Sequence, residues 1–92
     1  MLQASEKLWG AVAHATLAIS QQRGWRYGSH NELIQATRRL SEEQNDSNIY
    51  DQFREARRLH ANYYHGFLNA PELDDLRPTA HDFIYRVLAL VA

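Results

Sequence analysis

The stretch IYDQFREARRLHANYYHGF, residues 49–67, decides the fold of this chain. Apolar and aromatic side chains, with one histidine among them, recur along it at intervals of four, three, four, three and four residues: Ile49, Phe53, Ala56, His60, Tyr63 and Phe67. This spacing follows the turn of an α-helix and defines a single buried face. We therefore expect a long helix that Ser47 or Asn48 caps, that runs to about Asn69 and that Pro71 ends.

Two further helical patterns precede this stretch. Residues 2–23 carry apolar side chains at intervals of three and four, and Gly24 supplies a stop. The sequence SHNE at residues 29–32 matches a capping box, in which the last residue reaches back to the amide of the first, and it opens a second helix. The wholly polar run 41–48 marks the main loop before the third helix.

The end of the chain predicts a fourth helix. Thr79 with Asp82 resembles a second capping box directly after Pro78, and the acidic run 72–75 before it is expected to form a helical turn. The apolar side chains that this helix is expected to bury are Phe83, Ile84, Val87, Leu88 and Val91. No stretch alternates with a period of two, so we expect an all-α fold: a four- to five-helix antiparallel up-and-down bundle, formed by residues 1–92 as one domain.

The composition restricts the chemistry that such a bundle can carry. The chain has 92 residues, of which 45% are hydrophobic and 23% charged, as in an ordinary globular domain. It has no cysteine, which excludes disulfides, thiolate metal sites and thiol nucleophiles and fits a reducing compartment. The apolar run 8–20 is interrupted by His14 and is shorter than the roughly 20 residues that a membrane span needs. We therefore expect a cytoplasmic protein.

No sequence motif indicates a metal ion or an organic cofactor. A di-iron bundle needs a glutamate three residues before a histidine, and none of the five histidines has a carboxylate there. The four glycines are scattered and form neither a phosphate-binding loop nor a dinucleotide fingerprint. We expect no metal and no cofactor.

His60 lies on the apolar face of the third predicted helix and permits two interpretations. A histidine there commonly hydrogen-bonds to a tyrosine, to a backbone carbonyl or, in this chain, to His14 across the bundle. Alternatively, an imidazole in an apolar setting is easily held neutral at pH 7 and can act as a general base.

The opposite face of the same helix has an unusual composition for a solvated surface. Because an α-helix turns by about 100° per residue, this face carries Arg54, Arg58, Ala61, Asn62 and His65. Arginine and histidine are the residue types that hold phosphates and transfer protons. Arg58 and His65 lie about 10 Å apart along the helix axis, so both can reach one substrate.

Four short stretches carry a resemblance to a known family. They are SEKLWGAVAHA at residues 5–15, RGW at 23–25, GSH at 28–30 and LHANYY at 59–64. Together they resemble the archaeal paralogous-repeat branch of the HEPN superfamily over most of the chain. The resemblance implies a four- to five-helix bundle that is commonly dimeric. It also implies relatives that are metal-independent ribonucleases, toxins of toxin–antitoxin pairs or helical partners of minimal nucleotidyltransferases.

Active members of that superfamily carry an arginine and, after four to six residues, a histidine on the same helix. Arg54 and His60 are separated by five residues, and Arg58 and His65 by six. The polar residue that usually follows the arginine is replaced by Glu55 in the first pair and by a leucine in the second. The residues to which the resemblance gives catalytic roles are Arg58, His65 and His60. The candidate binding residues on the same helix are Arg54, Arg57, Asn62 and Tyr64.

These observations support two functional hypotheses. In the first, a HEPN-like homodimer binds RNA or a nucleotide and acts as a metal-independent ribonuclease of a toxin–antitoxin or defence system. Arginine would hold the phosphate, and a neutral histidine would take the proton from a ribose 2′-hydroxyl. In the second, the domain is a non-catalytic interaction module that acts through dimerisation or a protein partner. The replaced motif residues and the net charge of −1 favour this second hypothesis.

Overall fold

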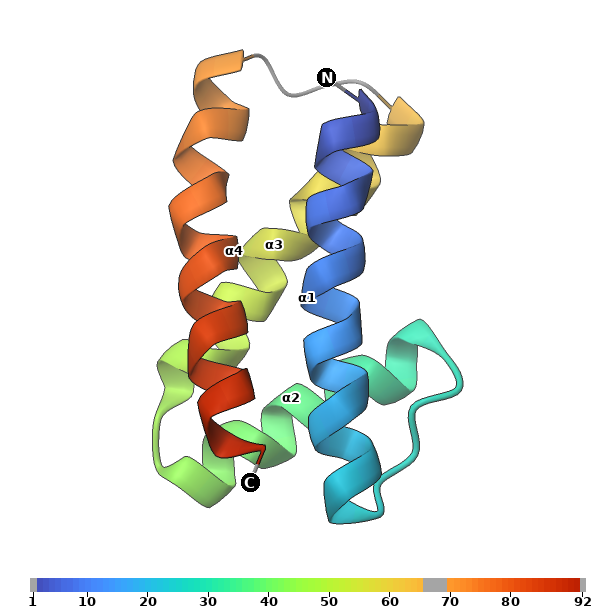
Figure 1. The fold of residues 1–92 in the computed structure, drawn as a ribbon, viewed down its shortest axis with the longest axis vertical. Coiled ribbons are helices and arrows are strands. Elements are labelled where there is room, and N and C mark those ends of the chain that lie inside the picture. The colour runs from blue at the N-terminus through green and yellow to red at the C-terminus, as the bar shows by residue number, and fades with distance from the viewer. Residues whose placement is uncertain (1, 66–69, 92) are drawn as a thin grey trace.

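A computed structural model describes residues 2–65 and 70–91, with the side chains of 6–61, 71, 72 and 74–91. The described residues form four helices and no strand: α1 (Leu2–Arg23), α2 (His30–Gln44), α3 (Ser47–His65) and α4 (Ala70–Leu90). In Figure 1, α1 and α4 both run from top to bottom, α3 runs back upward behind them, and α2 crosses the lower end. The expected all-α bundle is confirmed. No helix within the described ranges is long and apolar enough to cross a membrane.

Local signals in the connection between α1 and α2 shape that turn. Gly24 has a φ of 73°, in the left-handed region that favours glycine, and the amide of Trp25 donates to a carbonyl in the last turn of α1 at 2.9 Å. Ser29 caps α2 as expected, since its hydroxyl accepts from the Glu32 amide at 3.2 Å. The return bond differs from the expected capping box: the Glu32 carboxylate accepts from the Gly28 amide, at 2.8 Å, because that amide faces the first turn of α2.

The polar run 41–48 is mostly helical, which corrects the expected long loop. Only Asn45 and Asp46 lie between α2 and α3, and Asn45 ends α2 in the left-handed conformation, with a φ of 52°. Ser41 is buried, and its hydroxyl accepts from the Tyr50 amide at 2.9 Å. Polarity alone misplaces the loop because this serine joins two helices inside the bundle.

An acidic residue caps α3, in place of Ser47 or Asn48. The Oδ1 atom of Asp46 accepts from the Asn48 amide at 3.0 Å, and its other carboxylate oxygen pairs with Arg86 of α4. The cap therefore ties α3 to α4 as well as starting the helix. The expected extension of α3 to Asn69 lies outside the described residues.

The fourth helix passes through Pro78, which corrects the predicted start at that point. Pro71 lies in the first turn of α4, where proline is tolerated, and Thr79 is inside the helix. Pro78 removes one backbone hydrogen bond, but it is exposed. Leu76 and Ala80 beside it are 5% and 0% exposed, so packing holds the helix against the bundle across the proline.

The core lies between α1, α3 and α4, and α2 packs mainly on α3. The Phe53 ring lies between those of Trp9 and Phe83, with centroid separations of 5.5 and 5.7 Å. On α4 the buried stripe centres on Phe83 and Val87. Leu88 lies on the flank of this stripe and is 47% exposed, which corrects its expected burial. The residues at the edge of the stripe are half-buried: Ile84 and Val91.

Candidate functional site

An open hollow of about 280 Å³ lies where the first residue of α2 faces α3. The residues that line it are His30, Arg54, Arg57, Arg58, His60 and Ala61. We call it the arginine–histidine hollow. Four of the site residues named from the sequence, three arginines and His60, therefore border one space, and His30 joins them from another helix.

The helical spacing of α3 explains the arginine wall. Arg54, Arg57, Arg58 and Ala61 fall within about one-quarter of the helix circumference, so their side chains share one side. All three arginines are exposed, and Ala61 is half-buried. The short alanine side chain leaves room in the hollow next to the cations.

Three rings from three helices meet at this hollow. The centroids of His30 and His60 are 4.8 Å apart, and the Trp9 centroid lies 5.4 Å from His60 and 5.7 Å from His30. Trp9 is 4% exposed, whereas His60 is half-buried and His30 is exposed. The cluster thus has a buried indole at its base and two imidazoles toward solvent.

A carboxylate on α1 orients the His60 ring. The Oε2 atom of Glu6 lies 3.1 Å from Nδ1 of His60. When Nδ1 donates its proton to Glu6, the neutral ring has its lone pair on Nε2, as a general base requires. The carboxylate also stabilises the imidazolium that forms when that base takes a proton. Glu6, and not the exposed His14, is therefore the partner of His60 across the bundle.

The three arginines differ in their ion pairs. Guanidinium nitrogens of Arg58 lie 3.6 Å from Glu55 and 3.8 Å from Glu72, so two carboxylates share its charge. Arg54 and Arg57 have no carboxylate partner among the side chains that the structure describes. These two are the cations most available to an anionic ligand, whereas Arg58 is the most neutralised.

Tyr50 lies beside the arginines, and its pKa responds to them. Arg38 of α2 donates to the Tyr50 hydroxyl at 3.2 Å, and the Arg54 guanidinium lies 5.9 Å from the centroid of the tyrosine ring. The hydrogen bond from Arg38, followed by the charges of Arg38, Arg54 and Arg57, lowers the pKa of Tyr50. The charges of Arg54 and Arg57 thus act on Tyr50, although the hydrogen bond from Arg38, which lies outside the hollow, is the larger cause.

Three site residues named from the sequence lie outside the described side chains: Asn62, Tyr64 and His65. The pair of Arg58 and His65 therefore stays a prediction. Conversely, His30 and Glu6 belong to the site but are not assigned to it from the sequence. Both lie within the stretches that carry the family resemblance, as does His60. That shared membership is the sequence signal that could have identified them.

The described part of the chain holds no group of three histidine or carboxylate side chains that could bind a metal ion.

The model of the archaeal PaREP1/PaREP8 family matches residues 1–84, a range that includes the whole arginine–histidine hollow. No curated protein matches the chain, and no solved structure does.

Proposed function

The chain belongs to the archaeal PaREP1/PaREP8 family, and we propose that its arginine–histidine hollow binds RNA and cleaves it without a metal ion, in the manner of a HEPN ribonuclease. The observation that carries this proposal is the placement of two imidazoles, of His30 and His60, 4.8 Å apart beside the cations of Arg54 and Arg57. The resemblance to the HEPN superfamily supports a cytoplasmic homodimer of a toxin–antitoxin or defence system as the acting form.

Phosphate binding is the first step of the proposed function. The guanidinium forks of Arg54 and Arg57 match the geometry of phosphate oxygens. The two residues need not release a carboxylate partner within the described part of the chain before they bind such a ligand. The hollow is open on its outer side, which suits a strand that passes through it better than an enclosed small molecule.

The two imidazoles supply the proton transfers of an RNA transphosphorylation. His60, oriented by Glu6, takes the proton of the ribose 2′-hydroxyl while the 2′-oxygen bonds to the phosphorus. The bond from phosphorus to the 5′-oxygen breaks, and protonated His30 gives that oxygen a proton. The products are a 2′,3′-cyclic phosphate and a 5′-hydroxyl. Arg54 and Arg57 stabilise the negative charge that builds on the phosphate oxygens.

Binding of an uncleavable strand tests the arginines apart from the chemistry. We expect 2′-O-methyl RNA to bind the wild type, and Arg54→Gln and Arg57→Gln each to weaken it about fivefold or more and to reduce the salt slope by about 0.7. Arg77→Gln is the matched control, because Arg77 is an exposed arginine of α4 outside the hollow. Equal affinities for the wild type and the Arg54→Gln/Arg57→Gln double variant would contradict the proposal.

A second candidate function, that of an interaction module, is favoured by one feature of α4. Tyr85 and Leu88 are 75% and 47% exposed and lie about one helical turn apart, so a protein contact could bury both. Sedimentation of Tyr85→Ser and Leu88→Ser tests this function. A wild type that self-associates but cleaves no RNA, and that becomes monomeric in these variants, would favour the interaction module over the ribonuclease.

A further inference from the structure

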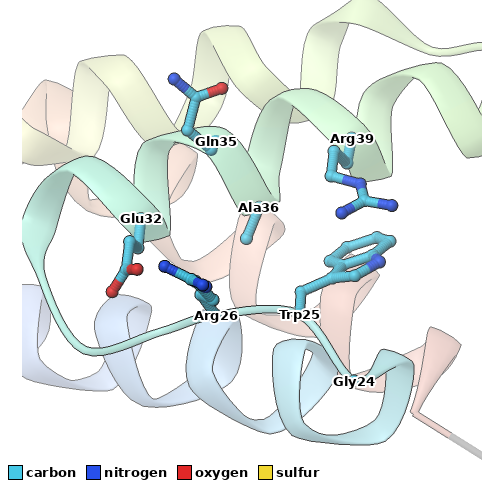
Figure 2. A pocket seen from close by; sticks show the side chains of 7 residues that line it. All are labelled: Gly24, Trp25, Arg26, Glu32, Gln35, Ala36 and Arg39. Atoms are coloured by element: carbon cyan, nitrogen blue, oxygen red, sulfur yellow. The ribbon is translucent and has the colours of Figure 1, made fainter.

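A second hollow, of about 390 Å³, lies between the connection after α1 and the first turns of α2. It shares no lining residue with the arginine–histidine hollow. Trp25 and Arg26 come from the connection, and Glu32, Ala36 and Arg39 come from α2 (Figure 2). Gly24 and Gln35 complete the lining, and we call this space the Trp25 pocket.

Backbone features of the connection fix the shape of the Trp25 pocket. The left-handed turn at Gly24 redirects the chain, and the helix-end bond of the Trp25 amide anchors the next residue. The Trp25 ring is half-buried and packs against the core, and the Arg39 guanidinium lies 4.9 Å from its centroid. Glu32, Ala36 and Arg39 are four and three residues apart, so they share one side of α2.

The charges of this pocket favour an anion. Arg26 and Arg39 are exposed, and within the described side chains neither has a carboxylate partner. The Glu32 carboxylate is the opposing charge, and its Oε1 atom is held by the Gly28 amide at 2.8 Å. Two cations, one fixed carboxylate, an indole and an apolar floor at Ala36, which is 2% exposed, therefore surround the same space.

The charged, aromatic and apolar side chains follow a definite order along the pocket. Figure 2 shows Glu32 at one end and Arg39 with the Trp25 ring at the other, with Arg26 and Ala36 between them. A nucleotide has the same sequence of groups: a base edge with hydrogen-bond donors, a flat base, and a phosphate at the far end. The Glu32 carboxylate suits the donor edge, the Arg26 guanidinium suits the face of the base, and Arg39, beside the indole, suits the phosphate.

We propose that the Trp25 pocket binds a guanine nucleotide. The base lies over Ala36 with its face against Arg26, between Glu32 and the Trp25 ring. Its N1–H and 2-amino groups donate to the Glu32 carboxylate, which other bases cannot match with two adjacent donors, and its phosphate pairs with Arg39. This site is independent of the proposed ribonuclease function, because it uses none of the residues of the arginine–histidine hollow.

The two tryptophans of the chain make the proposal testable with one spectrum. Trp9 packs against His30 and His60 of the arginine–histidine hollow, and Trp25 lines the new pocket, so their two indole N–H signals report on different sites. A titration of the ¹⁵N-labelled protein with GMP, with the signals assigned by Trp25→Phe, should shift the Trp25 signal saturably. Saturable shifts of the Trp9 signal alone, or of neither signal, would overturn the proposal for the Trp25 pocket.

Specificity provides the second test. Glu32→Gln should remove the preference for GMP over IMP, which lacks the 2-amino group, and Arg39→Gln should remove the preference for GMP over guanosine. Each variant should weaken GMP binding about tenfold, and Arg77→Gln should leave it unchanged. Equal affinity of the wild type for GMP, IMP and UMP would overturn the assignment, as would an affinity for inorganic phosphate that equals that for GMP.

The guanine nucleotide could be free or part of an RNA strand, and the same spectrum distinguishes these sources. Tighter binding of a short RNA with one guanosine than of GMP, with the Trp25 signal shifted, would identify the strand as the ligand. Tighter binding of GMP would identify the free nucleotide. A failure at Trp25 with an RNA-dependent shift of Trp9 would refute the Trp25 pocket while leaving the ribonuclease proposal standing.

Discussion

The Glu6 carboxylate lies 3.1 Å from Nδ1 of His60, although the two residues are 54 positions apart in the chain. This contact joins the start of α1 to the second half of α3 beside the exposed arginines. The carboxylate selects the ring tautomer with its lone pair on Nε2. Glu6 is thus a positioning residue in the proposed reaction, while His60 is the catalytic base.

We expect Glu6→Gln to lower kcat for RNA cleavage about 10- to 100-fold with little change in KM, because glutamine keeps a hydrogen bond but loses the charge that stabilises the imidazolium. The unfolding free energy should fall by at most about 1 kcal/mol, since the pair is partly exposed. Asp74→Asn, which breaks the exposed pair of Asp74 and Arg77, is the matched control. An equal change in KM and none in kcat would contradict the positioning role.

Tyr50 provides a pH titration that reports on the arginines. Its pKa is lowered by the hydrogen bond from Arg38 and by the charges of Arg38, Arg54 and Arg57, so Arg38→Gln should raise it most. A phosphate ligand at Arg54 and Arg57 should raise it too, because the ligand offsets their charge. Tyrosinate absorbance, with the Tyr50→Phe titration subtracted, measures both effects. A Tyr50 pKa that saturating ligand leaves unchanged would place that ligand away from these two arginines.

The ion pair between Arg23 and Glu43 predicts a pH-dependent stability. It joins the end of α1 to α2 at 2.8 Å, and its hydrogen bond lowers the pKa of Glu43. Because the folded pKa lies below the unfolded one, this contribution is present at neutral pH and is lost as the pH falls through the folded pKa. Glu43→Gln should therefore lower Tm at pH 7 slightly, and the difference should vanish in strong acid. A difference that grows as the pH falls would have the wrong sign.

Pro78 tests the continuity of α4. Because the proline removes one backbone hydrogen bond inside a continuous helix, we expect Pro78→Ala to raise the unfolding free energy by about 1–2 kcal/mol. This is less than the full cost of a helix proline, because proline also restricts the unfolded chain. Urea unfolding of the two proteins measures the change. If the helix instead began at Thr79, the substitution would be neutral or destabilising.

The helix type and the bundle could be predicted from the sequence, because the apolar stripe through Phe53 and Ala56 leaves one buried face. The boundaries could not be predicted as well, since tertiary packing decided them. Buried Ser41 keeps a polar run helical, and the packing of Leu76 carries α4 across Pro78. Polarity and proline content predict helix boundaries at Ser41 and Pro78, because these local signals contain no information on burial.

The candidate site could be predicted only in part. Arg54, Arg57 and His60 lie on one helix and line one hollow, although the helical pattern placed Arg54 on the face opposite His60. His30 and Glu6 reach the site from two other helices, and no local pattern specifies a contact between residues so distant in the chain. The pairing of Arg58 with Glu72 on α4 is likewise a product of the fold.

The most direct measurement is cleavage of single-stranded RNA in excess chelator by the wild type, His60→Gln and His81→Gln. His81 is an exposed histidine of α4 outside the hollow, so its variant is the control. The account predicts products that end in 2′,3′-cyclic phosphate from the wild type and the control, a loss of at least about 100-fold in folded His60→Gln, and no cleavage at a 2′-deoxy linkage. Cleavage that persists in His60→Gln, or a wild type that cleaves no RNA, would contradict it.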